Sequence, residues 1–154
     1  MNILVTVGTS AFDDLIQAVD EQLFGKSYHV TCQVADGNYV PVNFPHFRFS
    51  PEFRRYFEEA DLIISHGGAG TVFELLEMHK KILVVPNQMR RDKHQGDLAQ
   101  YVAQQKLGAV NWELKHLARD LDECIRSSYE RYRAEEFFYA DNILDYFGIP
   151  RQTS

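Results

Sequence analysis

The stretch LIISHGGAGTVFELL, residues 62–76, passes from an apolar run through a glycine-rich segment into a helical pattern. The run at residues 62–65 is short, apolar except for Ser65 and contains adjacent isoleucines, as is typical of a strand buried in a parallel sheet. Three glycines and one alanine then lie between His66 and Thr71. Apolar residues from Val72 onward recur at helical spacing. The stretch therefore predicts a unit of buried strand, tight loop and helix.

The same pattern recurs on both sides of this stretch. Upstream, a short run rich in β-branched residues, 3–7, ends at Gly8 and precedes a helical pattern that begins at Phe12. Downstream, the apolar run 82–85 stops at Pro86 and precedes another helical pattern. Weaker strands are expected at residues 28–34, 47–49 and 107–110, and further helices at 51–60 (with Ser50 as N-cap), 94–106, 114–127 and 131–147. Alternating strands and helices predict the α/β class, an open parallel sheet with helices on both faces.

The composition is that of an ordinary globular chain. The 154 residues are 45% hydrophobic and 25% charged, which is enough to bury a core without disulfides or metals. We expect residues 1–150 to form one domain, followed by a tail at 151–154. The formal net charge of −6 disfavours nucleic acid as a partner, because phosphate binding requires a basic face.

Cysteine usage and hydropathy indicate a cytoplasmic protein. Cys32 and Cys124 lie far apart and outside any CxxC pattern, which argues against a zinc site and fits a reducing compartment. No apolar run reaches the roughly 18 residues that a membrane span requires. The apolar start of the chain also lacks the preceding basic region of a signal peptide.

Three loops follow predicted strands at their carboxyl ends: residues 8–10, 66–71 and 86–94. In an open parallel sheet such loops face one crevice, where ligands bind. The glycine-rich loop lets backbone approach a ligand closely, and the helix after it offers free N–H groups and a positive dipole end. This pattern indicates a phosphate or diphosphate site, although the glycines equally fit a tight turn without a ligand.

Glu74 lies about one turn into the helix after the glycine-rich loop. Its carboxylate there is placed to accept hydrogen bonds from both hydroxyls of a ribose. The segment from Thr71 to Glu74 is also a capping box, in which the glutamate only satisfies the helix start. The sequence leaves both interpretations open.

Residues 65–74, SHGGAGTVFE, resemble the signature of the family 28 glycosyltransferase C-terminal domain. The loop in which Pro86-Asn87 precedes His94-Gln95 is similar to a later segment of that domain, and residues 5–10 resemble its first loop. The resemblance covers nearly the whole chain, with these motifs in the right order. It implies a Rossmann-like domain equivalent to the C-terminal, donor-binding half of a GT-B enzyme.

The chain is also similar in length to stand-alone subunits of this family. These are the soluble subunit of the dolichol-linked GlcNAc transferase and the PssE-type subunits of exopolysaccharide synthesis. The resemblance implies the donor-binding, catalytic subunit of a heteromeric, inverting glycosyltransferase that needs neither metal nor cofactor. Its donor would be a UDP-sugar and its acceptor a lipid-linked sugar in polysaccharide synthesis. A membrane-attached, PssD-type subunit would bind the acceptor and recruit this cytoplasmic chain to the inner face of the membrane.

The resemblance also assigns roles to individual residues. Residues 8–10 would approach the diphosphate, residues 66–71 would wrap the phosphates and sugar, and Glu74 would hold the ribose. Residues 94–95 would contact the donor sugar or its phosphate, and residues 49–50 lie where the family reads uracil through backbone groups. The donor-binding residues are thus Gly8, Thr9, Ser10, Ser50, Gly67, Gly68, Ala69, Gly70, Thr71, Glu74, His94 and Gln95.

His66 is the candidate catalytic residue. A histidine titrates near neutral pH and is suited to act as a general base, but it is equally suited to donate a hydrogen bond to a phosphate oxygen. We favour the second role because His66 begins the phosphate loop. The base that activates the acceptor would then come from the partner half.

Two charged segments have alternative interpretations. Arg90, Arg91 and Lys93 are placed to neutralise a leaving diphosphate or to face anionic lipid, although a solvated loop is favoured for at least two of them. Asp120 and Asp122 form a DxD pattern, but residues two apart on a helix point to different sides. We therefore interpret them as a solvated face and predict no metal requirement.

The last predicted helix carries more apolar surface than one buried face needs. These side chains are Phe137, Phe138, Tyr139, Ile143, Leu144, Tyr146 and Phe147. Packing on the sheet and docking onto a partner subunit are equally favoured.

Two other functions stay open. A non-catalytic, regulatory subunit that binds a UDP-sugar would show nucleotide binding without transfer. An NAD-dependent Rossmann enzyme is disfavoured, because the first loop reads Gly-Thr-Ser where the dinucleotide fingerprint requires GxGxxG.

Overall fold

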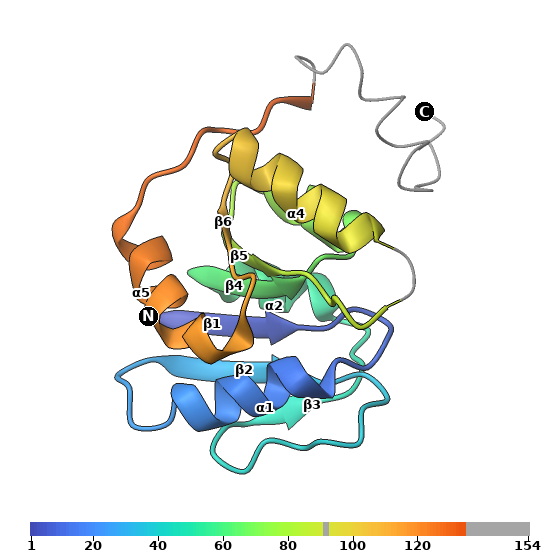
Figure 1. Cartoon of the computed structure of the whole chain (residues 1–154). Helices are drawn as coiled ribbons and strands as arrows, with labels where there is room; N and C mark the ends of the chain where they lie inside the picture. The colour runs from blue at the N-terminus through green and yellow to red at the C-terminus, as the bar shows by residue number, and fades with distance from the viewer. Residues whose placement is uncertain (91–92, 135–154) are drawn as a thin grey trace.

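Six parallel strands form one sheet at the centre of the computed structural model, which describes residues 1–90 and 93–134 (Figure 1). The strands are β1 (Asn2–Thr6), β2 (His29–Gln33), β3 (His46–Phe47), β4 (Leu62–His66), β5 (Lys81–Val85) and β6 (Ala109–Val110). Their order across the sheet is β3-β2-β1-β4-β5-β6, which is the strand order of the Rossmann fold. The predicted α/β class with an open parallel sheet is confirmed.

Helices cover both faces of this sheet. They are α1 (Asp13–Gln22), α2 (Phe53–Glu59), α3 (Ala69–Glu77), α4 (His94–Gln104) and α5 (Leu117–Arg126), with a short 3-10 helix, η1 (Leu114–His116), before α5. Ile3 and Val5 of β1 pack into the core beneath α1 and α5. Leu4, between them, packs into the core beneath α2, α3 and α4. Successive residues of a strand point to opposite faces, so β1 is buried on both sides, as its apolar sequence predicts.

Within the described residues, no helix has the length and the apolar character needed to cross a bilayer.

Several predicted element boundaries are wrong, including the start of the last strand, which is Ala109 and not residue 107. Phe49 lies beyond β3, which ends at Phe47. The helix expected from Pro51 begins at Phe53 instead, and Ser50 is not its N-cap. The Ser50 hydroxyl accepts a hydrogen bond from the Glu52 amide at 3.1 Å, so it closes a turn that precedes the helix. Residues 131–133 have no regular structure, and the aromatic segment predicted to continue that helix lies outside the described residues.

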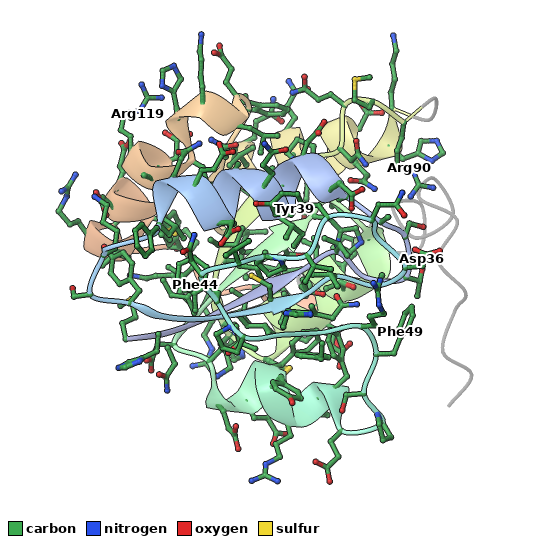
Figure 2. The ribbon with its side chains drawn as sticks, turned by 90° about the horizontal axis from the view of Figure 1, so that it is seen from below. Asp36, Tyr39, Phe44, Phe49, Arg90 and Arg119 are labelled. Carbon is green, nitrogen blue, oxygen red and sulfur yellow. The ribbon has the colours of Figure 1, made fainter. Side chains whose placement is uncertain are left out.

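Asp20 of α1 anchors the long loop that leads into β3. Its buried carboxylate accepts hydrogen bonds from the Tyr39 hydroxyl at 2.7 Å, the Val42 amide at 2.8 Å and the Asn43 amide at 2.9 Å. Burial alone would raise the pKa of Asp20, yet hydrogen bonds to its carboxylate hold that pKa below its usual value. Figure 2 shows Tyr39 beside α1. The loop is thereby fixed against the helix, which places β3 at the edge of the sheet.

Candidate functional site

A cavity lies at the carboxyl ends of β1 and β4. The chain proceeds from β1 outward to β3 on one side and from β4 outward to β6 on the other, and open sheets bind ligands where the strand order diverges in this way. The cavity has a volume of about 380 Å³. It is lined by Gly8, Thr9, Ser10, His66, Gly67, Gly68, Ala69, Gly70, Thr71, Arg90, His94 and Gln95.

The three predicted loops therefore meet in one cavity. All predicted site residues except Ser50 and Glu74 line it. Arg90, from the loop after β5, joins them, although the sequence favoured a solvated loop for most of its basic cluster. Figure 2 shows Arg90 at the same end of the molecule as Asp36 and Phe49, with Arg119 toward the opposite end. Lys93 is exposed at the start of α4, and Arg91 lies outside the described residues.

Two glycines enclose the imidazole ring of His66. A Cβ atom at Gly68 would collide with His66 Nε2, and a Cβ atom at Gly8 would lie 2.6 Å from the same nitrogen. Gly8 also has a φ of +71°, a backbone conformation that is energetically unfavourable for residues other than glycine. The position of the ring therefore favours glycine at both positions, in addition to any ligand.

The environment of His66 keeps its imidazole neutral. The side chain is buried, with 9% of its surface exposed. Burial lowers the pKa of His66 to about 4; a hydrogen bond to the backbone of Thr6 opposes this shift, and the positive charge of Arg90 adds to it. At neutral pH the ring therefore carries one N–H donor and no charge. This favours a hydrogen-bonding role over that of a general base, because a base with this pKa binds a proton weakly at pH 7.

The first turn of α3 presents free amides to the cavity. Gly68 is the N-cap and provides no side-chain cap, and the helical bonding begins with the Val72 amide donating to the Gly68 carbonyl at 3.0 Å. The amides of residues 69–71 have no acceptor among the described residues. These amides and the helix dipole together favour an anion at this place.

The interpretation of residues 71–74 as a capping box is wrong. Thr71 is the third residue of α3, so it lies inside the helix instead of capping it. The Glu74 carboxylate accepts a hydrogen bond from Arg54 Nη1 of α2 at 3.2 Å, and 42% of its side chain is exposed. The ion pair uses Oε1 of the carboxylate, which leaves Oε2 for another donor.

Gln95 links the loops after β4 and β5. Its side-chain oxygen accepts hydrogen bonds from the Gly67 amide at 3.1 Å and from the Asn87 amide at 2.9 Å. Two backbone donors fix which end of the amide is the oxygen. The amide nitrogen has no acceptor among the described residues. Since Gln95 lines the cavity, its N–H donors are available to a ligand.

The loop after β1 is held by hydrogen bonds to Thr6 and to Gln33, and the sequence did not single out Gln33. The Gly8 amide donates to the Thr6 hydroxyl at 3.2 Å, so it is not available to a phosphate. The side chain of Gln33 donates to the Gly8 carbonyl at 2.9 Å and accepts from the Val7 amide at 3.1 Å. Thr9 and Ser10 supply the polar groups that this loop offers to the cavity.

The DxD pattern on α5 does not form a metal site. The Asp120 carboxylate accepts a hydrogen bond from the Asn111 side chain at 2.7 Å, and Asp122 accepts one from the Tyr28 hydroxyl at 2.8 Å. The two carboxylates therefore point to different neighbours, as predicted, but both are half-buried and do not form the solvated face that we expected. Among the described residues, no three His, Cys, Asp or Glu side chains gather closely enough to hold a metal ion.

Comparison with known proteins identifies relatives among sugar transferases. The human UDP-N-acetylglucosamine transferase subunit ALG13 is 36% identical over 110 residues, which cover 63% of this chain and 10% of that protein. The corresponding subunit of Kluyveromyces lactis is 35% identical over 101 residues, which cover 64% of this chain and 47% of that protein. The chain thus spans less than half the length of these curated relatives.

Solved structures share the fold. The NMR solution structure of ALG13 matches with a TM-score of 0.62 and 15% identity, covering 96% of both chains. The crystal structure of Acinetobacter baumannii MurG matches with a TM-score of 0.61 and 20% identity, covering 81% of this chain and 41% of that one. The predicted likeness to the C-terminal half of a GT-B fold is confirmed. The family model of the glycosyltransferase family 28 C-terminal domain matches residues 2–137, and this chain therefore belongs to that family.

Proposed function

We propose that this chain is the donor-binding, catalytic subunit of a heteromeric, inverting glycosyltransferase that uses a UDP-sugar. The observation that carries the proposal is the cavity at the carboxyl ends of β1 and β4, where the strand order diverges. There the free amides of residues 69–71 face a space that small side chains keep open. The names of the relatives, which describe UDP-N-acetylglucosamine transferases, support a UDP-sugar as the donor class.

The diphosphate is proposed to lie over the first turn of α3. The amides of residues 69–71 and the hydroxyls of Thr9 and Ser10 are its donors, with the neutral His66 as a further one. Arg90 adds a positive charge at the same cavity. Such groups stabilise the charge that develops on the leaving diphosphate, without a metal ion.

The remaining parts of the donor are proposed to lie at the rim. Glu74 accepts from the ribose hydroxyls through the oxygen that Arg54 leaves free. His94 and the amide nitrogen of Gln95 contact the sugar or its phosphate. Ser50 lies outside the residues that line the cavity, and in this proposal it marks the uracil side.

The reaction is displacement at the anomeric carbon of the sugar. The acceptor oxygen forms a bond to that carbon, the bond from the carbon to the diphosphate oxygen breaks, and UDP leaves with the bonding pair. The hydroxyl proton passes to a base. No aspartate or glutamate is among the described residues that line the cavity, and the pKa of His66 is lowered to about 4. We therefore assign the base to the partner half.

The partner in this proposal is a membrane-attached subunit that binds a lipid-linked sugar. It faces the open side of the cavity and supplies the acceptor hydroxyl together with its base. The product belongs to polysaccharide synthesis, and recruitment through this partner places the chain at the cytoplasmic face of the membrane.

Transfer is expected only when both halves are present. We expect co-expression with the product of the neighbouring gene, followed by an assay with a panel of UDP-sugars, to give transfer to a lipid-linked acceptor. The same chain alone should bind UDP and transfer nothing. Transfer by the chain alone would contradict the proposal that it is one subunit of a heteromeric enzyme. UDP binding without transfer beside any partner would favour a regulatory subunit instead.

UDP should stabilise the folded chain, and Glu74 should carry much of the effect. At a concentration of about 100 times the Kd, a ligand adds about 2.7 kcal/mol to the free energy of unfolding. We expect Glu74→Ala to remove most of the rise in melting temperature that UDP produces, because the ribose loses its acceptor. Thermal unfolding with and without UDP measures this.

Glu59→Ala is the matched control. Glu59 is also a glutamate bonded to an arginine, since it accepts from Arg55 Nε at 2.8 Å. It is the last residue of α2, whereas Glu74 belongs to α3, whose first turn lines the cavity. The Glu59→Ala variant should keep the full UDP effect. Equal effects of UDP on Glu74→Ala and the wild type would show that Glu74 does not hold the nucleotide.

A further inference from the structure

Gln33 is a buried amide whose hydrogen-bonding groups are all occupied. Only 2% of the residue is exposed at the end of β2. Its oxygen accepts from the Thr6 hydroxyl at 2.7 Å and from the Val7 amide at 3.1 Å. Its nitrogen donates to the Gly8 carbonyl at 2.9 Å and to the Arg48 carbonyl at 2.9 Å. The side chain therefore holds main-chain groups of two loops at once.

The first of these loops is the one that follows β1. Thr6 and Gln33 face each other in the register of the two strands, so the amide reaches the loop without crossing the sheet. The Thr6 hydroxyl, which donates to Gln33, accepts in turn from the Gly8 amide. Both polar backbone groups of Gly8 are thus fixed, one directly and one through Thr6. This sets the positions of Thr9 and Ser10, and it holds Gly8 against the ring of His66.

The second loop follows β3, and its Phe49 lies at the same end of the molecule as Arg90 (Figure 2). Besides the bond from its carbonyl to Gln33, Arg48 donates from Nη1 to the carbonyls of Ala35 and Gly37, both at 2.9 Å. Ala35 has a positive φ of 51°, so this turn is held in a conformation that needs such support. Gln33 thereby joins the segment that precedes Phe49 and Ser50 to the loop of Gly8.

We propose that Gln33 is a positioning residue for nucleotide binding, which locks the loop after β1 and the loop after β3 into one unit. The inference rests on the proposed nucleotide site. Glutamine suits this place because only an amide both accepts from Thr6 and Val7 and donates to two carbonyls. An ionised carboxylate of the same shape would place a negative oxygen against the carbonyls of Gly8 and Arg48.

Gln33→Glu tests the proposal with least change of volume. We expect UDP to bind this variant at least about tenfold more weakly, as the loss of buried hydrogen bonds implies. Binding should recover in part as the pH falls and the new carboxyl group takes up a proton, which restores one donor. The wild type should not show this recovery. Calorimetric titration with UDP across a pH series, at temperatures well below each melting point, measures both effects.

Val30→Ala provides the control for a purely structural role. Val30 is buried in the same strand at the end away from the cavity, so its truncation lowers stability without touching either loop. It should leave the affinity for UDP unchanged. Thr6→Val, which removes the hydroxyl between Gln33 and Gly8, should weaken UDP binding less than additively with Gln33→Glu, because both changes break one network.

Amide hydrogen exchange distinguishes this inference from the function on which it rests. In Gln33→Glu without nucleotide, exchange at Val7 and Gly8 should accelerate more than at other residues of β1, and Val30→Ala should show no such local effect. UDP binding by the wild type and by Gln33→Glu with equal affinity would overturn the inference alone. Absence of UDP binding by the wild type would overturn the proposed function. Unchanged hydrogen exchange at residues 7–8 in Gln33→Glu would overturn the positioning role of Gln33.

Discussion

Gly68→Ala is expected to lower the free energy of unfolding by about 1–3 kcal/mol, the usual range for overpacking a close-packed interior. Gly68 has a φ of −67°, so an alanine backbone is unstrained there and the effect is purely steric. The added methyl group meets the buried His66 ring, which must shift to make room for it. The displaced ring should also abolish most of the stabilisation by UDP. Chemical denaturation and UDP-dependent thermal shifts measure the two effects.

The double variant His66→Ala/Gly68→Ala separates sterics from ligand contact. Without the ring, the alanine at position 68 meets no imidazole, so adding it to the His66→Ala background should cost little stability. UDP affinity should stay low in both variants that lack His66, because the hydrogen-bond donor is gone. A full stability loss from Gly68→Ala in the absence of the ring would contradict the enclosure of His66 by these glycines.

Gly70→Ala is expected to have opposite effects on stability and on binding. Gly70 lies in the first turn of α3, and a Cβ atom there would meet nothing within 4 Å. Alanine in a helix is favoured over glycine by up to about 1 kcal/mol, so stability should stay constant or rise. Because Gly70 lines the cavity, its methyl group would occupy space proposed for the diphosphate. We expect UDP affinity to fall at least about tenfold, because overpacking a fitted space costs about 1–3 kcal/mol.

Gly96→Ala is the matched control for this prediction. Gly96 lies near the start of α4, where a Cβ atom likewise meets nothing within 4 Å, but it is not part of the cavity lining. It should gain stability as Gly70→Ala does and keep the affinity for UDP. If both variants bind UDP as the wild type does, the diphosphate does not lie over the first turn of α3.

The sheet could be predicted from the sequence because its central strands are apolar on both faces. Residues 3–5, 62–64 and 82–85 are continuous apolar runs, and a buried parallel strand accommodates such runs between helical patterns. The predicted boundaries of the short edge strands and the predicted start of α2 were less accurate. Their boundaries depend on turns such as that of Ser50, whose side chain has more than one way to satisfy nearby amides.

The site could be predicted as a set of loops but not as a network. Glycines and other small residues indicate where backbone can approach a ligand, and these residues do meet in the cavity. The bonds that position them join residues far apart in sequence. Gln33 reaches Gly8 only because β1 and β2 pair in a particular register, and Arg54 reaches Glu74 only because α2 and α3 cover the same face. The neutral state of His66 likewise follows from burial, which no local pattern shows.

The oxygen of Gln95 has a consequence for any attempt to change the donor sugar by loop exchange. One acceptor atom ties together the backbone at the ends of two neighbouring strands, so the stretch after Val85 and the glycine stretch after His66 cannot be displaced independently. A transplanted segment spanning residues 87–93 would have to present its first amide at the same distance from that oxygen. Otherwise the graft would shift Gly67 as well, and a change intended for sugar choice would disturb the proposed nucleotide site.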